Sequence, residues 1–153
     1  RHASLAATLD PSPTAGVTPG LALFEKNAAD NPKKYYLLRL ENSCLADGVT
    51  IHGLWPQWAE WCPGPPFDPA SLGKIQSELQ KWWPSCVPPY NATAFHEHEW
   101  LKHGKCTNLS LLSYFETALN LRAQVAPRIS TCFTQTFARM DCPPQPRLCP
   151  TPT

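Results

Sequence analysis

The stretch FHEHEWLKHGKC, residues 95–106, holds three of the chain's five histidines together with two glutamates and two lysines. A solvated helix face can carry charges, but it has no reason to concentrate imidazoles, whose charge changes near physiological pH. The pattern predicts a helix over residues 94–103. Crowding of titratable groups on one short helix indicates a site for chemistry.

Four of these groups share one side of the predicted helix. Lys102 follows His98 by four residues, and a helix brings such positions to the same face. Glu99 and His103 are spaced in the same way. A zinc helix of the His-Glu-x-x-His type would need a second imidazole where Lys102 stands, and a protonated amine has no lone pair to donate. The sequence therefore predicts acid–base chemistry on an anion here, and no metal site.

A second segment, TIHGLWPQW at residues 50–58, supplies one more histidine. Its β-branched and apolar residues predict a strand, in which His52 taken alone would be an ordinary core histidine. Gly53 allows close backbone approach, and Trp55 offers a face on which a base could stack. Two imidazoles, a lysine and a glutamate suit phosphodiester cleavage: one imidazole deprotonates a 2′-hydroxyl and the other protonates the departing 5′-oxygen. That reaction needs no metal.

Composition limits the class of protein. The 153 residues are 42% hydrophobic and include six Trp, six Phe and four Tyr, which predicts a packed globule. The formal net charge of only +1 gives no overall basic field, so a nucleic acid must be gripped locally. No apolar run is long enough to span a membrane. We expect residues 21–153 to form a single domain, preceded by a flexible arm rich in Pro, Ser and Thr at residues 1–20.

The remaining sequence mixes helices and strands. Strands are predicted at residues 33–40 and 48–55, helices at 68–83, 94–103 and 110–124, and a strand or hairpin at 129–137. They do not alternate as a parallel doubly wound sheet requires, so the fold class is α+β. His96 is expected to face solvent or the rim of the site. Five tryptophans are assigned to packing by default: Trp58, Trp61, Trp82, Trp83 and Trp100.

Seven cysteines without a C-x-x-C pair indicate a disulfide framework formed in an oxidising compartment. Two glycosylation sequons, at Asn91 and Asn108, agree with passage through a secretory pathway. The chain is therefore expected to be a secreted glycoprotein. Because seven is odd, one thiol is left over, free or engaged between chains.

The segments at residues 50–58 and 95–106 together resemble the two active-site segments of the ribonuclease T2 family. The second matches the family pattern of histidine, glutamate, aromatic, any residue, lysine, histidine, glycine, any residue and cysteine. The likeness covers most of residues 35–150. It implies an antiparallel sheet packed with helices, and cleavage of single-stranded RNA through a 2′,3′-cyclic phosphate to 3′-phosphate ends. It implies no metal or cofactor, and a secreted protein or one in a vacuolar or lysosomal lumen.

The resemblance also assigns catalytic roles position by position. His52 is implied as the general acid toward the leaving 5′-oxygen, and His103 as the base on the 2′-hydroxyl. Glu99 and Lys102 are implied to stabilise the transition state, and His98 to hold phosphate. From the helical spacing, we also expect Glu99 to raise the pKa of His103 or to orient its ring.

Substrate binding is implied at two further positions. Trp55 would stack on a base, while Gln57 stands where some family members have an acidic residue that reads the base. The chain also departs from the family. The stretch LRLENSC, residues 38–44, lacks the usual Gln-Trp-Pro motif and offers a single cysteine. The helical sequence that normally precedes the terminal strands is almost absent.

Two disulfides are implied by the resemblance. Cys62 is expected to pair with Cys106, and Cys142 with Cys149. The other cysteines would form one further bridge and leave one thiol, with the choice open; they are Cys44, Cys86 and Cys132.

Two other classes of function remain beside the ribonuclease. A shortened family member could act as a secreted binding, signalling or toxin-like protein with little RNA cleavage, or the chain could be a metal-binding or storage module. Digestion of RNA in the presence of EDTA separates the three, because only the ribonuclease cleaves without metal.

Overall fold

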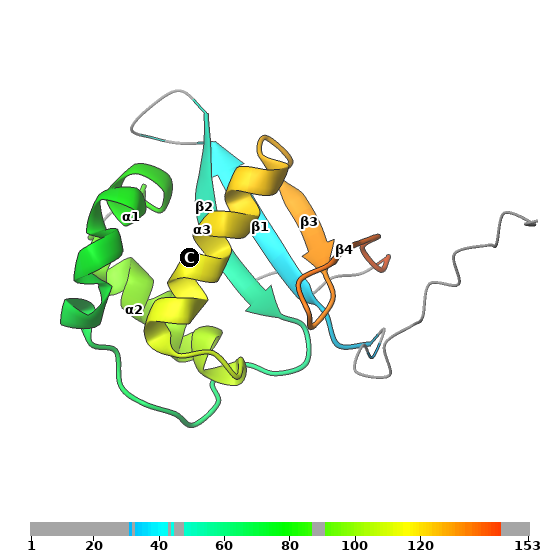
Figure 1. Cartoon of the computed structure of the whole chain (residues 1–153), viewed down its shortest axis with the longest axis horizontal. Helices are drawn as coiled ribbons and strands as arrows, with labels where there is room; N and C mark the ends of the chain where they lie inside the picture. The colour runs from blue at the N-terminus through cyan, green and yellow to red at the C-terminus, as the bar shows by residue number, and fades with distance from the viewer. Residues whose placement is uncertain (1–30, 32, 43, 45–47, 87–90, 145–153) are drawn as a thin grey trace, which may run out of the picture.

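The computed structural model describes residues 31, 33–42, 44, 48–86 and 91–144. Within them a four-stranded sheet has the strand order β2-β1-β3-β4, with helices against it (Figure 1). All three strand pairings are antiparallel. The expected α+β class is confirmed. The predicted arm, residues 1–20, lies outside the described residues.

The central strand, β1 (Tyr36–Asn42), is covered on both faces. Leu37 and Leu38, which point to opposite sides of the sheet, are each 0% exposed. This burial explains why the sequence here is continuously apolar rather than alternating. The partner strands are β2 (Val49–Pro56) and β3 (Ser130–Phe133), and β4 (Arg139–Met140) completes the edge. The predicted strands and terminal hairpin are confirmed.

The β1–β2 ladder contains a bulge at His52, one of the predicted site residues. Arg39 pairs with Gly53 and the next residue, Leu40, pairs with Ile51. His52 is therefore the extra residue on β2, without an opposite Cα on β1. A bulge bends and twists its strand, and so redirects the side chain that it carries.

The helices begin with a segment that differs from expectation. Instead of one α-helix over residues 68–83, a 3-10 segment (Pro69–Ile75) precedes α1 (Gln76–Trp82). Gly73 lies inside that segment, and glycine disfavours an α-helix interior by about 1 kcal/mol. The predicted cap is present, since Asp68 Oδ1 accepts a hydrogen bond from the amide of Ala70 at 3.1 Å.

The other helices agree with prediction within two residues. They are α2 (Ala92–Lys102) and α3 (Leu111–Val125). A short 3-10 helix, η2 (Gly104–Cys106), follows α2 and was not predicted. Asn91 caps α2 and Ser110 caps α3, each accepting a hydrogen bond from a backbone amide three residues later. Polar residues that favour caps thus define where both helices start.

Helix α3 forms the main core against one face of the sheet (Figure 1). Its stripe of Tyr114, Phe115 and Ala118 is 0% exposed, as the sequence predicted. The Tyr114 hydroxyl donates to the carbonyl of Leu54 at 2.9 Å, which joins α3 to β2. A smaller apolar cluster covers the opposite face; its members are Tyr35, Leu37, Trp55 and Cys132.

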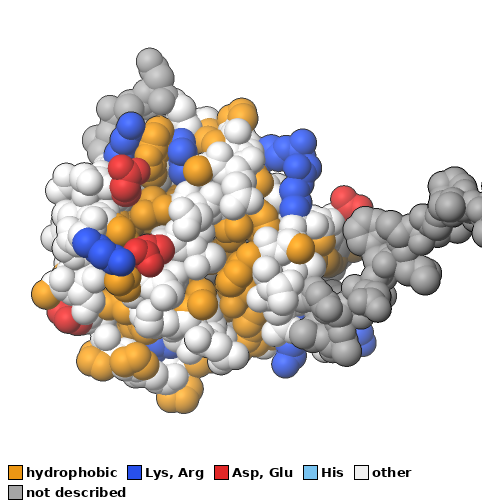
Figure 2. Space-filling model, viewed as in Figure 1, with side chains coloured by type: hydrophobic (Ala, Val, Ile, Leu, Met, Phe, Trp, Pro, Cys, Tyr) orange, Lys and Arg blue, Asp and Glu red, His pale blue; other side chains and the backbone are white. Residues whose placement is uncertain are grey.

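The surface above α1 and α3 is mixed in character. Figure 2 shows hydrophobic, basic and acidic side chains interspersed over this face. Arg122 of α3 stacks on the Trp82 ring, 3.4 Å from its centroid, and also donates to the carbonyl of Val49. No helix in the described ranges is long and apolar enough to cross a membrane.

Three disulfides join the described segments. The predicted Cys62–Cys106 bridge is present, and Cys44–Cys86 settles one pairing that the sequence left open. The expected Cys142–Cys149 pair is wrong, because Cys142 is bonded to Cys132. Cys132 lies opposite Met140 in the β3–β4 ladder, so the hairpin brings Cys142 within a Cα–Cα distance of 5.1 Å. Cys149 lies outside the described residues.

Candidate active site

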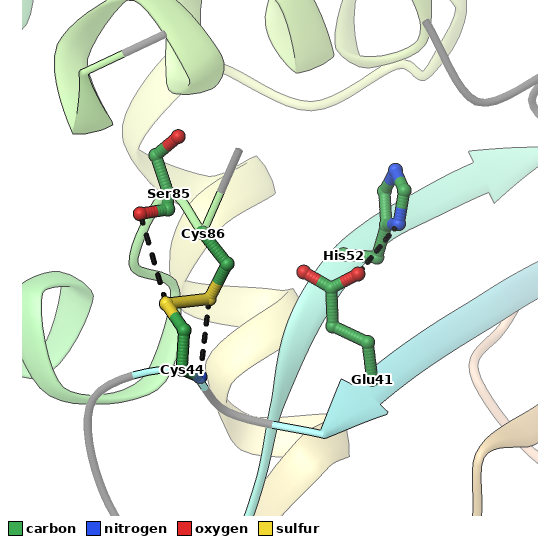
Figure 3. The surroundings of a disulfide bond; sticks show 5 residues. All are labelled: Glu41, Cys44, His52, Ser85 and Cys86. Atoms are coloured by element: carbon green, nitrogen blue, oxygen red, sulfur yellow. Dashed lines mark hydrogen bonds and ion pairs between the residues drawn. A yellow bond between two sulfur atoms is a disulfide. The ribbon is translucent and has the colours of Figure 1, made fainter. Parts of the chain in front are cut away.

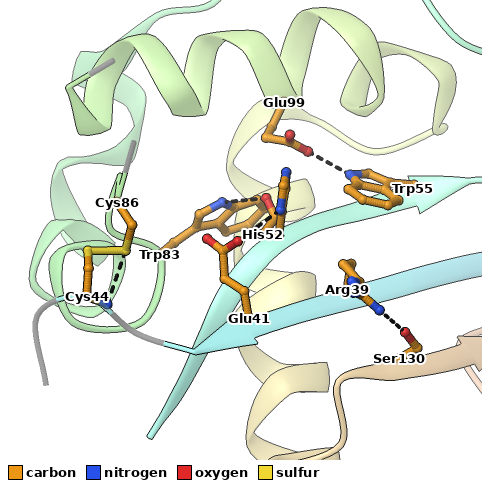
Figure 4. A network of polar contacts seen from close by, with 9 residues as sticks. All are labelled: Arg39, Glu41, Cys44, His52, Trp55, Trp83, Cys86, Glu99 and Ser130. Atoms are coloured by element: carbon orange, nitrogen blue, oxygen red, sulfur yellow. Dashed lines mark hydrogen bonds and ion pairs between the residues drawn. A yellow bond between two sulfur atoms is a disulfide. The ribbon is translucent and has the colours of Figure 1, made fainter. Parts of the chain in front are cut away.

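His52 is held at the bulge of β2 by contacts on every side. Its Nδ1 lies 3.1 Å from Oε2 of Glu41 on β1, and its backbone carbonyl accepts a hydrogen bond from Nε1 of Trp83 (Figure 4). The rings of Trp55 and Phe95 meet its ring edge to face, with centroids 5.3 and 5.6 Å away. The His52 side chain remains 18% exposed. It is therefore fixed in orientation and still accessible.

Helix α2 brings the other predicted groups to β2. The carboxylate of Glu99 accepts a hydrogen bond from Nε1 of Trp55 at 2.9 Å (Figure 4). The His103 ring stacks on the Trp55 ring, with centroids 5.4 Å apart. Lys102 and His103 are almost fully buried, while His98 is half-buried. Trp55 thus contacts two of the four groups of the predicted face, Glu99 and His103.

The partners within this face differ from one expectation. We expected Glu99 to act on His103, four residues later on the same helix. Instead Glu99 is hydrogen-bonded to Trp55, and its charge acts on His52. Neither ring nitrogen of His103 has a hydrogen-bond partner among the described residues. Helical spacing placed the two groups on one side, but the strand determined where the carboxylate points.

Gly53 is required by this arrangement. A Cβ atom at this position would overlap with Nε1 of Trp55 and with Oε2 of Glu99, the two atoms of the hydrogen bond that joins β2 to α2. Gly104 has a similar role at the end of α2, where a Cβ would overlap with the ring of Trp100. The glycines of both motifs are therefore explained by close packing.

The charges around His52 favour its protonated form. Burial lowers the pKa of His52, but the hydrogen bond to Glu41 and the negative charge of Glu99 outweigh that effect. Arg39 opposes them, and the net pKa of His52 lies above its ordinary value. A histidine in this environment is suited to donate a proton.

The surroundings of His103 act in the opposite direction. Burial, followed by the positive charges of Lys102, His98 and His52, lowers its pKa to about 3. His103 is therefore neutral near physiological pH and has a lone pair to accept a proton. Burial, followed by the charges of Lys102 and His52, also lowers the pKa of His98.

Glu99 is completely buried, and burial raises its pKa to about 7. This value already includes the opposing effects of His52, the hydrogen bond from Trp55, and Lys102, which lower the pKa. The carboxyl group can thus change charge near neutral pH, between two histidines with opposite requirements.

Two tryptophans differ from their predicted roles, while Trp83 and Trp100 are buried in the core as predicted. Trp55 is 2% exposed, so in this structure it positions Glu99 and His103 and presents no open face to a base. Trp61, assigned by default to packing, is 59% exposed, and that assignment is wrong. Its ring meets the His98 ring at 5.7 Å and lies 5.9 Å from Nζ of Lys102. Trp61 is thus an aromatic surface beside the site that the sequence did not single out.

The backbone makes Trp61 project outward. Its φ of 56° is in the left-handed region, and its amide donates to the carbonyl of Lys102 at 2.8 Å. The next residue, Cys62, is bonded to Cys106, which ties this loop to the end of α2. The position of Trp61 directly before a paired cysteine was the one available sequence signal, and it does not predict exposure.

Two further predictions concern residues near the rim. Gln57 is 8% exposed and donates from Nε2 to the carbonyl of Trp55 at 3.2 Å, so it supports the end of β2. His96 was expected to face solvent, but it is only 4% exposed, and its Nε2 lies 2.8 Å from the carbonyl of Trp83. It is a core histidine, and burial lowers its pKa.

The sequons and the question of metal can be placed on the structure. Asn91 and Asn108 are both exposed, and the cap of α2 uses only Oδ1 of Asn91. Glycosylation of the two amides stays a prediction. In the described ranges no three His, Cys, Asp or Glu side chains are grouped so that they could share a metal ion.

Comparison with known proteins identifies the family. The sequence model of the ribonuclease T2 family matches residues 28–140, so the chain belongs to that family. Ribonuclease MC of Momordica charantia is 39% identical over 90 residues, covering 52% of this chain and 47% of the relative. A ribonuclease-like storage protein of Panax ginseng is 35% identical over 114 residues, covering 61% and 48%. The matched region spans less than half the length of these curated relatives.

Solved structures agree with this assignment. Ribonuclease MC1 from bitter gourd seeds superposes with a TM-score of 0.52 at 32% identity, covering 60% of this chain and 57% of that one. Human RNase T2 superposes with a TM-score of 0.55 at 29% identity, covering 62% and 58%. The expected antiparallel, disulfide-stapled fold is confirmed.

The buried carboxyl group leads to a prediction about stability. A folded-state pKa of about 7, above the ordinary value, means that the folded protein loses stability as pH rises toward 7. Glu99→Gln removes the ionisable group but keeps its size. We expect the variant to exceed the native protein in free energy of unfolding by about 1 to 3 kcal/mol at pH 8, and by much less at pH 4.5.

Urea unfolding at the two pH values measures this difference. Glu97→Gln, an exposed carboxylate on the same helix, is the matched control and should change stability little at either pH. If Glu99→Gln changed the free energy of unfolding by the same amount at both pH values, burial of the charge would not be the dominant effect.

Proposed function

We propose that this chain is a metal-independent endoribonuclease that cleaves single-stranded RNA by transphosphorylation, through a 2′,3′-cyclic phosphate to 3′-phosphate ends. The observation that carries the proposal is the pair of histidines with opposite surroundings. Carboxylates favour charge on His52, whereas burial and neighbouring cations keep His103 neutral. Two titratable groups whose pKa values are shifted in opposite directions in this way are suited to act as acid and base.

The proposed reaction assigns one proton transfer to each imidazole. His103 removes the proton of the 2′-hydroxyl, whose oxygen bonds to phosphorus as the bond from phosphorus to the 5′-oxygen breaks. His52 delivers its proton to that departing oxygen. Lys102 supplies positive charge toward the crowded phosphorane, Glu99 fixes the arrangement through Trp55, and water later opens the cyclic phosphate with the two histidines exchanging roles.

Accessibility separates the proposed roles. His52 and His98 already reach solvent, which suits a proton donor and a phosphate contact. His103 is only 1% exposed, so the substrate must open a path to its ring before the 2′-hydroxyl can approach. Geometry of this kind often tightens or rearranges when substrate binds.

Nucleotide binding by relatives supports the substrate class. Variants of ribonuclease MC1 that are about 30% identical to this chain have structures in complex with 5′-GMP and with 5′-UMP. Trp61 offers a base a stacking face next to His98, which we assign to phosphate. Base and phosphate could thus be held side by side.

The proposed compartment is oxidising. Three disulfides in the described segments support secretion, or delivery to a vacuolar or lysosomal lumen. The relatives include an extracellular ribonuclease LE and an intracellular ribonuclease LX, both from Solanum lycopersicum, so they do not select one location.

The central test is RNA digestion in EDTA. We expect His52→Phe and His103→Phe each to reduce cleavage by about 100-fold or more, because each removes one proton transfer. A 2′,3′-cyclic phosphate should appear transiently, and single-stranded DNA should stay intact because it lacks the nucleophile. Native levels of cleavage by either variant would remove that histidine from the mechanism. A folded native protein that leaves RNA intact would instead favour a binding role.

The pH profile tests the assignment of acid and base. His103 must be neutral, and its pKa of about 3 allows this well into the acid range. His52 must be protonated, and its raised pKa maintains this beyond its ordinary value. We expect kcat/KM to hold between about pH 4 and 6.5 and to fall at alkaline pH. A rate that rises steadily to pH 9 would contradict the two-histidine mechanism.

The stacking role of Trp61 predicts a change in binding. Trp61→Ala should weaken binding of single-stranded RNA about 5-fold or more, as expected for loss of one base stack, whereas Trp61→Phe should retain part of the affinity. Fluorescence titration of a His103→Phe background with an oligonucleotide measures this without cleavage. Ile129→Ala, at another exposed hydrophobic residue, is the control. An unchanged affinity in Trp61→Ala would exclude the contact.

A further inference from the structure

Glu41 is a carboxylate at the active site that neither active-site motif contains. It lies on β1, within the stretch that departs from the usual Gln-Trp-Pro motif. Its Oε2 is 3.1 Å from Nδ1 of His52, and the two side chains are 31% and 18% exposed (Figures 3 and 4). The pair is therefore partly shielded from water, which strengthens it relative to a fully exposed pair.

The fold holds both partners of this pair. The bulge places His52 out of the regular ladder, and its carbonyl is bonded to Trp83. On the other side, Glu41 is paired with Thr50 in the sheet, and the Cys44–Cys86 bridge follows three residues later (Figure 3). The contact thus joins two anchored segments of backbone.

We propose that Glu41 is the positioning residue for His52, holding the imidazole by Nδ1 so that Nε2 carries the proton to the departing 5′-oxygen. The proposal rests on the ribonuclease function argued above. Glu41 touches no reacting atom and acts only through His52. A carboxylate bound at one ring nitrogen fixes which nitrogen is protonated after transfer, leaving a lone pair on Nε2 to accept a proton from water in the second step.

Among the groups that face His52, Glu41 has the largest effect in favour of its protonated form. On β1 these groups are Glu41 and Arg39. Helix α2 contributes Glu99, His98 and the uncharged Phe95, and His103 follows at its end. Trp55 and Trp83 contribute uncharged contacts. Burial lowers the pKa of His52 most strongly, and the hydrogen bond to Glu41 is the largest opposing effect. Removing that bond should therefore lower the pKa of His52.

Two substrates with different leaving groups distinguish positioning from a general structural effect. A dinucleotide must receive a proton on its 5′-oxygen, whereas a nucleoside 3′-(4-nitrophenyl phosphate) releases a stable anion that needs none. We expect Glu41→Gln to lower kcat on the dinucleotide about 10-fold, a fraction of the general acid's full contribution, and to leave kcat on the nitrophenyl ester within 2-fold. Glu41→Asp keeps the carboxylate, so its kcat on the dinucleotide should lie between those of the native protein and Glu41→Gln.

The pH profile and a direct titration complete the test. In Glu41→Gln the alkaline limb for the dinucleotide should move to lower pH, and NMR should show a lower pKa for His52. Glu97→Gln controls for loss of one exposed carboxylate and should change neither. Equal losses on both substrates, or an unchanged His52 titration, would overturn the proposal. If the native protein cleaves neither substrate, the ribonuclease function fails, while the NMR titration still decides whether Glu41 controls His52.

Discussion

The hydrogen bond between Trp55 and Glu99 is the contact on which the rest of the site depends. It joins strand β2 to helix α2 with both partners buried, and it lies directly over Gly53, where no side chain fits. Through it the carboxyl group is directed toward His52, and the Trp55 ring is left to stack on His103. Loss of either partner would leave a buried polar group without its hydrogen bond.

The site holds its charges in a low-dielectric environment. Glu99 and Lys102 are buried on one helix, with His98 and His103 beside them. Burial opposes the charged forms of Glu99, His98 and His103, so neighbouring groups decide which of them carry charge. Glu41 on β1 and Glu99 on α2 favour a positive charge on His52. The cations around His103 disfavour a positive charge on His103 itself. Glu99, whose buried charge costs stability, therefore also favours charge on the proposed acid, His52.

Disulfides fix the segments that carry these groups. Cys62–Cys106 joins the loop after β2 to the end of α2, and so holds Trp61 beside the helix. Cys44–Cys86 joins the end of β1 to the chain that leads into α2. These two bridges therefore secure both edges of the site within the described residues.

The sequence by itself determined the helix carrying Glu99 and His103, the strand carrying His52 and the family, because residue spacing fixes which side chains share a face of one element. It could not decide contacts between elements. Four features depend on how strands and helices pack together: the exposure of Trp61, the burial of His96, the Cys132–Cys142 bridge and the hydrogen bond of Glu99 to Trp55. Glu41 is the clearest example of a contact that sequence alone did not predict. It belongs to neither active-site motif, and a bulge in the β1–β2 ladder places His52 against it.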